Sequence, residues 1–255
     1  MKHAEMIRLV PGADTAVLFI HGIVGTPNHF TTQISMLDLV PETWSLYNVL
    51  LEGHGMGVKE FARSSMKQWK AQVWRIFQDL AKTHERVILV AHSMGTLFSI
   101  QLALENPEKV PFLFLIGVPL RPGLRLFGIV NSLRIAFNCV REDHPLEKAL
   151  RDDCGVRTSP WLWQYIGWIP RFLELFREIY RTEKVLKELK VPCTAYQSKK
   201  DELVSNFTRR VLARSGVVEI VDLPESTHCY YAPRDAALLR ADFDRRCENL
   251  IKKKA

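Results

Sequence analysis

The sequence predicts an α/β fold with a mostly parallel central sheet and helices on both faces. The first observation is a set of short runs rich in Val, Ile, Leu and Phe, which are almost continuously apolar, as is typical of strands buried on both sides of a parallel sheet. The second is that helical periodicity lies between these runs, and strand–helix alternation favours this architecture. The predicted strands are residues 16–20, 47–51, 87–91, 112–116, 193–197 and 217–221.

Two segments show the spacing of a helix with one buried face. Between Ser65 and His84 the apolar residues recur at i, i+4, i+7, i+8 and i+11, which predicts an amphipathic helix. A C-terminal helix is expected from about Asp235. The residues expected to be buried are Trp69, Val73, Ile76, Phe77 and Leu80 in the first helix, and Leu238, Leu239, Phe243 and Ile251 in the second.

One interval interrupts the alternation. Between Leu120 and about Leu189 we find apolar periodic stretches and an aromatic cluster, but no convincing strand. We therefore predict one domain with an insertion: residues 1–119 and 190–255 form the core, and residues 120–189 form a helical cap.

Composition excludes several classes of function. The chain has 255 residues, 47% hydrophobic and 25% charged, which is ordinary for one globular domain. Its net charge of +7 is spread along the chain, so we expect no nucleic-acid partner. The five cysteines have no zinc spacing, and we expect no metal and no organic cofactor.

The sequence also bears on location. No apolar run approaches the ~20 residues of a membrane span, and the N-terminal residues lack the apolar stretch of a signal peptide. We expect a cytoplasmic protein without stable membrane insertion, and the oligomeric state is left open.

The motif A-H-S-M-G at residues 91–95 joins a predicted strand directly to a predicted helix. So tight a corner needs small residues two positions before and after its apex, and Ala91 and Gly95 occupy them. The apex, Ser93, would then be lifted above the sheet edge. A serine here could instead simply cap the helix, since serine is a favoured N-cap.

The motif resembles the nucleophile elbow of the α/β-hydrolase family, with Ala91 in place of the more usual first glycine. That family orders its triad as serine, acid, histidine, with the last two in loops after late strands. Asp201 follows the strand at 193–197, and His228 follows the strand at 217–221. The resemblance therefore implies a Ser93–Asp201–His228 triad, with Glu202 as the fallback acid and Asp222 as a weaker competitor. His92 is expected to be structural.

Two further loops extend the resemblance. The H-G-I-V-G segment at 21–25 looks like the oxyanion loop of the family, which implies the Ile23 amide as one donor. The Met94 amide, at a helix N-terminus, is the other expected donor. The L-E-G-H-G segment at 51–55 resembles the L-x-G-H-G segment of compact bacterial carboxylesterases and monoacylglycerol lipases.

These features predict a serine hydrolase that cleaves small-molecule carboxylic esters with short or medium acyl chains. Trp161, Trp163 and Trp168 of the cap are the predicted substrate-binding residues, although aromatic residues at helical spacing are often core instead. A thioesterase, an acyltransferase, a carbon–carbon hydrolase and a noncatalytic binder with the same fold remain alternatives.

Overall fold

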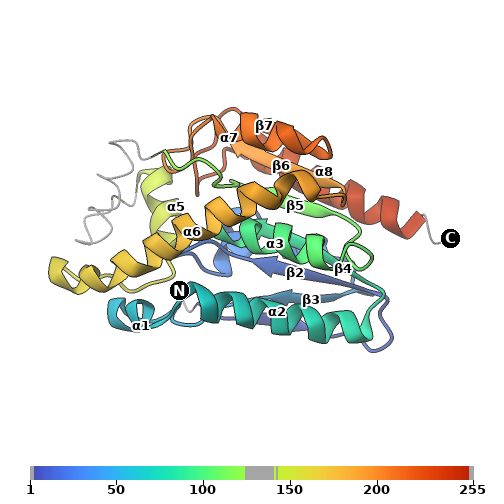
Figure 1. The fold of residues 1–255 in the computed structure, drawn as a ribbon, viewed down its shortest axis with the longest axis horizontal. Coiled ribbons are helices and arrows are strands. Elements are labelled where there is room, and N and C mark those ends of the chain that lie inside the picture. The colour runs from blue at the N-terminus through green and yellow to red at the C-terminus, as the bar shows by residue number, and fades with distance from the viewer. Residues whose placement is uncertain (1–2, 124–140, 142, 253–255) are drawn as a thin grey trace.

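The computed structural model describes residues 3–123, 141 and 143–252, and it contains one seven-stranded sheet (Figure 1). The strand order is β1-β3-β2-β4-β5-β6-β7, with β1 antiparallel to β3 and every other pair parallel. The predicted fold class is confirmed. The strands are β1 (Met6–Arg8), β2 (Thr15–Ile20), β3 (Ser45–Asn48), β4 (Arg86–His92), β5 (Leu113–Ile116), β6 (Cys193–Ser198) and β7 (Val218–Leu223).

All six predicted strands exist, and the sequence reading missed β1. This strand has only three residues, and Met6 and Ile7 are about half exposed, so it carries no buried apolar run. The strand predicted at 47–51 lies at Ser45–Asn48, where the chain pairs with β2. Beyond Asn48 it leaves the sheet and enters the L-E-G-H-G loop.

Alternate residues of the central strands face two separate apolar layers. In β2, Leu18 and Ile20 face one layer, whereas Val17 and Phe19 face the other. Helices α1, α2, α3 and α6 contribute to the first layer, and η1, η2 and α8 contribute to the second. Burial on both faces explains why the strands read as continuous apolar runs.

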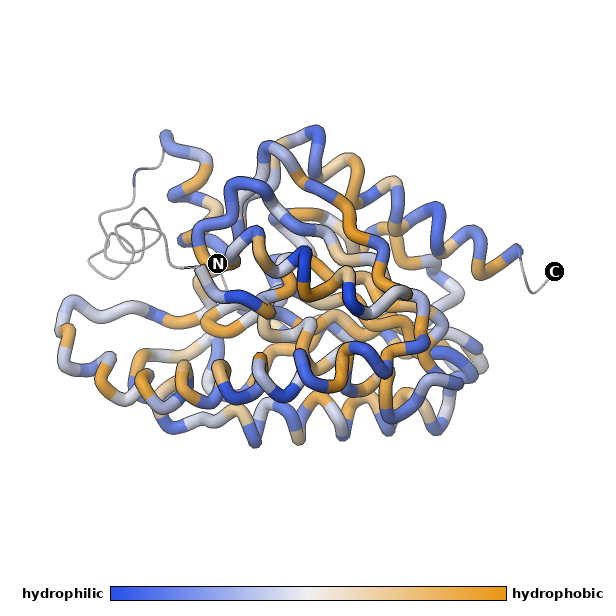
Figure 2. Tube along the Cα trace, turned by 45° about the horizontal axis from the view of Figure 1, so that its top comes forward, coloured by the Kyte–Doolittle hydropathy of each residue, from blue (hydrophilic) through white to orange (hydrophobic). Residues whose placement is uncertain are grey.

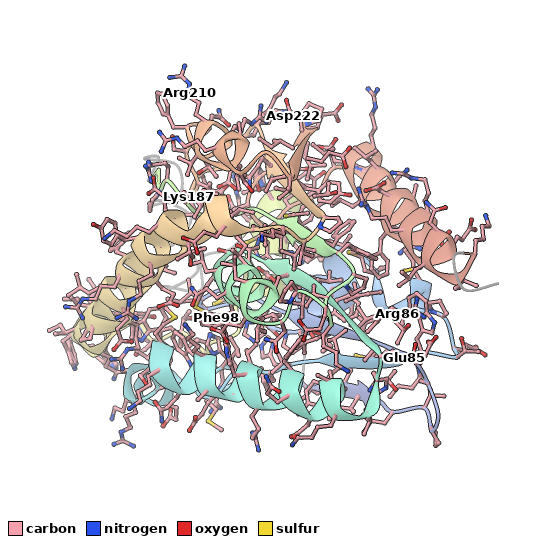
Figure 3. The ribbon with its side chains drawn as sticks, turned by 45° about the vertical axis from the view of Figure 1, so that its right-hand side comes forward. Glu85, Arg86, Phe98, Lys187, Arg210 and Asp222 are labelled. Atoms are coloured by element: carbon pink, nitrogen blue, oxygen red, sulfur yellow. The ribbon has the colours of Figure 1, made fainter. Side chains whose placement is uncertain are left out.

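The helices lie on both sides of the sheet, as expected. Figure 3 shows Phe98 of α3 among the helices that cover the first layer, and its ring meets the Trp74 ring edge-on at 6.2 Å. The helices are α1 (Val58–Arg63), α2 (Met66–Thr83), α3 (Met94–Glu105), α5 (Pro145–Asp153), α6 (Ile169–Val185), α7 (Thr208–Leu212) and α8 (Pro233–Lys252), with short turns η1 (His29–Gln33), η2 (Leu37–Leu39), η3 (Leu162–Trp168), η4 (Leu186–Glu188) and η5 (Ala213–Ser215).

The amphipathic predictions were right for α2 and partly wrong for α8. All five residues predicted to be buried in α2 are buried, and the Ser65 hydroxyl caps this helix by accepting from the Gln68 amide. In α8, Leu239 and Phe243 are buried, but Leu238 and Ile251 are 42% and 47% exposed. Leu238 precedes Leu239 by only 100° of helix rotation, and Ile251 lies in the last turn, beyond the edge of the core.

The described part of the predicted cap is helical and consists of α5, η3, α6 and η4. Helix α6 runs from an end that projects beyond the sheet back along α3 (Figure 1). The division into a core and a cap remains a proposal, and residues 124–140 and 142 of that interval lie outside the described residues.

Candidate active site

The corner between β4 and α3 has the geometry that the motif predicts. Ser93 has φ 50° and ψ −122°, a region that residues other than glycine seldom adopt. Its amide donates to the Ile116 carbonyl of β5 at 2.9 Å, which ties the corner to the neighbouring strand. The serine hydroxyl is thus held at the carboxyl edge of the sheet, and Ser93 is 8% exposed.

Two glycines allow other segments to approach this corner. A Cβ at Gly95 would overlap the Ile20 carbonyl oxygen at the end of β2. A Cβ at Gly22 would lie 2.8 Å from the Ser93 Cβ. The spacing S-x-G and the H-G pair therefore have one steric cause, because the start of α3 packs closely against the end of β2 and the loop that follows it. Ala91 is buried in the first apolar layer.

The structure brings Ser93, His228 and Asp201 together. His228 lies in the loop between β7 and α8, and its Nε2 is 3.0 Å from the Ser93 Oγ. Its Nδ1 is 2.8 Å from Oδ2 of Asp201, which lies in the loop after β6. The other Asp201 oxygen accepts from the Leu203 and Val204 amides, both at 2.8 Å. Fixed by these two amides, the carboxylate sets the orientation of the imidazole.

The two competing acids have other partners. The Glu202 Oε2 accepts from the His228 backbone amide at 3.1 Å, so this carboxylate supports the loop rather than the ring. Burial raises the Glu202 pKa above its ordinary value. Asp222 is more exposed and is ion-paired with Lys199 and Arg209.

The imidazole of His228 is buried beside the Asp201 carboxylate. Burial lowers the pKa of this imidazole. The charge of Asp201, the hydrogen bond to Asp201 and the charge of Glu202 outweigh the effect of burial, and together they raise the pKa to about 9. A protonated ring is therefore stable in this position.

Loop 21–25 presents backbone amides beside Ser93. The Gly25 amide closes the turn onto the Gly22 carbonyl at 3.1 Å, and Val24 has a positive φ of 58°. Among the described residues, neither the Ile23 amide nor the Met94 amide, the first of α3, donates to a protein acceptor. Both amides are therefore without a protein acceptor in the described part of the chain, and their role as oxyanion donors stays a prediction.

His21 braces this loop. Its Nδ1 donates to the Gly22 carbonyl at 2.8 Å, and its Nε2 accepts from the Leu51 amide at 3.1 Å. Burial lowers the His21 pKa to about 4, so the ring is neutral and holds one tautomer. It joins loop 21–25 to the L-E-G-H-G loop.

Gly155, just after α5, forms a second link between these loops, which the sequence reading missed. The Gly155 amide donates to the Val24 carbonyl at 2.6 Å, and its carbonyl accepts from the Gly55 amide at 2.5 Å. A Cβ at Gly155 would overlap the Gly25 carbonyl oxygen. A glycine two residues after a helix was the available signal, but no pattern linked it to a loop 130 positions earlier.

Behind His228 lies a buried polar cluster that the sequence reading also missed. The His228 carbonyl accepts from His92 Nε2 at 3.0 Å and from the Tyr231 hydroxyl at 3.3 Å. The His92 ring stacks on His29 with centroids 3.7 Å apart, and His29 Nδ1 is 3.0 Å from Asp153 Oδ1. His92 is structural, as predicted, and burial lowers its pKa well below the ordinary value. The cluster fixes the backbone of His228 through its carbonyl group.

Three members of this cluster have the donor atoms of a metal site. Ligand atoms of His29, His92 and Asp153 lie within 4.8 Å of one another. However, the two imidazoles are inclined by only 17° in their stack, so their in-plane lone pairs do not converge on one point. Burial raises the Asp153 pKa, but the charge of His29 and hydrogen bonds from His29 and Cys229 lower it below its ordinary value. We assign these residues a hydrogen-bonding role.

The three predicted substrate-binding tryptophans differ in burial. The rings of Trp161 and Trp163 lie with their centroids 4.8 Å apart, and the two residues are 54% and 62% exposed. Trp168 is half-buried, and its ring centroid lies 4.6 Å from that of Phe61. Its indole N–H donates to the Val58 carbonyl. Contact of Trp161, Trp163 and Trp168 with a substrate stays a prediction.

Comparison with known proteins places the chain in a family. The profile of the Alpha/beta hydrolase family matches residues 17–241, and the chain belongs to that family. It is also 28% identical over 145 residues to the dihydrolipoyllysine-residue acetyltransferase component of the acetoin cleaving system of Cupriavidus necator. That match covers 57% of this chain but only 37% of the relative's length.

Solved structures share the fold at low sequence identity. One comes from work on LipS and LipT, two metagenome-derived lipolytic enzymes. It has a TM-score of 0.70 and 20% identity, and the match covers 96% of this chain and 98% of that chain. A monoacylglycerol lipase of Paleococcus ferrophilus has a TM-score of 0.65, 15% identity, and 97% and 98% covered. The thioesterase domain from the curacin biosynthetic pathway has a TM-score of 0.63, 20% identity, and 94% and 99% covered.

Proposed function

We propose that this protein is a serine hydrolase that cleaves carboxylic esters with short or medium acyl chains. The observation that carries the proposal is the position of His228, which contacts Ser93 Oγ through one ring nitrogen and Asp201 through the other. A serine hydroxyl is a poor nucleophile at neutral pH, and a base oriented in this way activates it.

The geometry supports a two-step reaction. Ser93 Oγ attacks the ester carbonyl while His228 Nε2 takes its proton, and the carbonyl oxygen becomes an oxyanion held by the Ile23 and Met94 amides. His228 then protonates the departing alcohol, which leaves an acyl group on Ser93. Water, deprotonated by His228, attacks this acyl group, and Ser93 regains its proton as the acid departs. Each oxyanion donor is worth about 3 kcal/mol in such sites.

Covalent labelling tests the nucleophile. We expect a fluorophosphonate probe to label the wild type and the control Ser99→Ala, but not Ser93→Ala. Ser99 lies on the same helix, and its hydroxyl donates to the Gly95 carbonyl, so the control removes a buried hydroxyl without changing the elbow residue. An unlabelled wild type would leave a noncatalytic binder as the better account.

The substrate class needs a separate experiment. The same three residues could cleave a thioester, and the similarity to a thioesterase domain makes this the second candidate. We expect a series of p-nitrophenyl esters of increasing acyl length to be hydrolysed fastest at short or medium length, and faster than acyl thioesters of equal length. Faster thioester cleavage would reverse this assignment without changing the nucleophile.

A further inference from the structure

Nine of the seventeen large apolar side chains that are exposed in the described part of the chain lie between Trp161 and Tyr180. We call this set the outer apolar stripe. In Figure 2, hydrophobic segments recur along α6, whose first turns project at the lower left. Its members are Trp161, Leu162, Trp163 and Ile166 in and beside η3, and Ile169, Phe172, Leu173, Phe176 and Tyr180 in α6.

The α6 part of the stripe has the regular spacing of one helix face. Its five residues follow i, i+3, i+4, i+7 and i+11, which is a single line along an α-helix. They are 37% to 59% exposed. The opposite side of the helix instead packs inward through Leu175, Glu178, Ile179 and Thr182. A contiguous apolar face of this size on the outside of a protein marks an interaction surface.

Charge identifies the kind of partner. Residues 157–187 contain six arginines and lysines but three glutamates. All three glutamates are ion-paired within the protein, and none is classed as exposed. Five of the cations are exposed, namely Arg157, Arg177, Arg181, Lys184 and Lys187, and Figure 3 shows Lys187 at the outer surface.

The cations lie beside the apolar face rather than across it. Arg177 and Lys184 follow the stripe at 60° to 80° of helix rotation from Ile169, and the Lys184 ammonium lies 4.3 Å from the Tyr180 ring. This ammonium lies over an aromatic ring of the stripe, so a cation is held next to the apolar face, as in helices that place apolar groups in lipid and cations at headgroup level. Exposed tryptophan also favours the interface between acyl chains and headgroups.

We propose that the outer apolar stripe docks the protein on the surface of an anionic phospholipid bilayer. Docking would be peripheral: within the described residues, no helix combines the length and apolar character that crossing a bilayer requires. The inner side of α6 stays packed on the core, and only the stripe enters the headgroup region. This inference goes beyond the proposed hydrolysis and does not depend on Ser93.

Co-sedimentation with vesicles tests the proposal on the full chain. We expect binding to phosphatidylcholine vesicles that contain phosphatidylserine, weaker binding without it, and loss at high salt, since each cation near an anionic surface contributes about fivefold in affinity. The variant Trp163→Ala/Phe176→Ala should bind at least about tenfold more weakly, because both half-exposed aromatic side chains would be lost from the lipid contact. The control Leu238→Ala, which removes an exposed leucine from α8, should bind as the wild type does.

Two further measurements separate this proposal from its competitors. Vesicles should shift the tryptophan emission to shorter wavelength in the wild type and in Ser93→Ala alike, because Trp161 and Trp163 leave water. Absence of binding to anionic vesicles, or equal binding by the double variant, would overturn the proposal. So would sedimentation equilibrium showing a dimer that the double variant abolishes, since the stripe would then be occupied by a second copy.

Discussion

Helices α2 and α6 carry similar apolar patterns and use them in opposite ways. In α2 the stripe from Trp69 to Leu80 faces the sheet and is buried. In α6 the stripe from Ile169 to Tyr180 faces outward, and the helix is held to the core by its other side. An apolar stripe therefore predicts that a face will be covered, but it does not specify whether the cover is the protein's own core.

The buried side of α6 is partly polar, which explains how the helix is held without its stripe. Glu178 accepts from the Gln101 amide at 2.8 Å and from Lys70 at 3.2 Å, and Thr182 accepts from Gln101 at 2.7 Å. These bonds fix α6 to α2 and α3. The contrast between the two helices gives the following predictions.

The largest effect on stability is expected in the inward stripe. Trp69 is fully buried, and its indole donates to the Glu52 carbonyl at 2.7 Å. Trp69→Ala should lower the free energy of unfolding by about 3–5 kcal/mol, through the cavity it leaves. Trp163→Ala should change it by less than about 0.5 kcal/mol. Urea denaturation of both variants is the measurement, and equal losses would mean that the outer stripe is packed in solution.

The active site and the outer apolar stripe should differ in their response to pH. His228 must be neutral to accept the Ser93 proton, and its pKa is raised to about 9. The kcat/KM for a neutral ester should therefore rise with pH up to about 9, by roughly tenfold per pH unit below the pKa. Binding to anionic vesicles should stay constant from about pH 7 to 9, because arginine and lysine remain charged there.

A variant checks the cause of this titration. Asp201→Asn removes the charge that raises the His228 pKa, so the midpoint of kcat/KM should move to lower pH while its maximum falls. Stability depends on pH in the opposite direction to activity. A raised pKa in the folded state stabilises the protein below pH 6.5, and this contribution is lost as the pH rises through about 9. A midpoint unchanged in the variant would contradict the assignment.

A substitution on the polar side of α6 should have an intermediate effect on the free energy of unfolding. Glu178→Ala leaves the Gln101 amide and the Lys70 ammonium without this partner, and should lower the free energy of unfolding by about 1–3 kcal/mol. Circular dichroism during thermal unfolding would measure it. The substitution leaves the stripe in place, so vesicle binding at a temperature where the variant is folded should persist. Loss of stability by Phe176→Ala instead would show that the apolar face holds the helix.

The sequence predicted most of the fold and the three central residues, because both are set by local rules. Buried parallel strands require continuous apolar runs, and the corner at Ser93 requires small neighbours such as Gly95. The order of triad residues implied by the resemblance to the α/β-hydrolase family then selected Asp201 and His228. What could not be predicted depends on contacts between distant segments: Gly155 on loop 21–25, the pairing of His29 with Asp153, and the side of α6 that faces the core.

The smallest effect on stability within α6 is expected at Leu173, and Leu175, two positions further along the helix, provides the comparison. Leu173 is 50% exposed in the outer apolar stripe, whereas Leu175 is 9% exposed and packs in the first layer. Leu173→Gln should change the free energy of unfolding by no more than about 0.5 kcal/mol, because glutamine is a good helix former and its amide stays in water. Leu175→Gln buries that amide among apolar groups and should cost about 1–3 kcal/mol. Urea denaturation of the pair compares the same substitution on the two faces of one helix. Equal costs would mean that Leu173 is covered in the free protein, and the stripe would then have no surface to offer a bilayer.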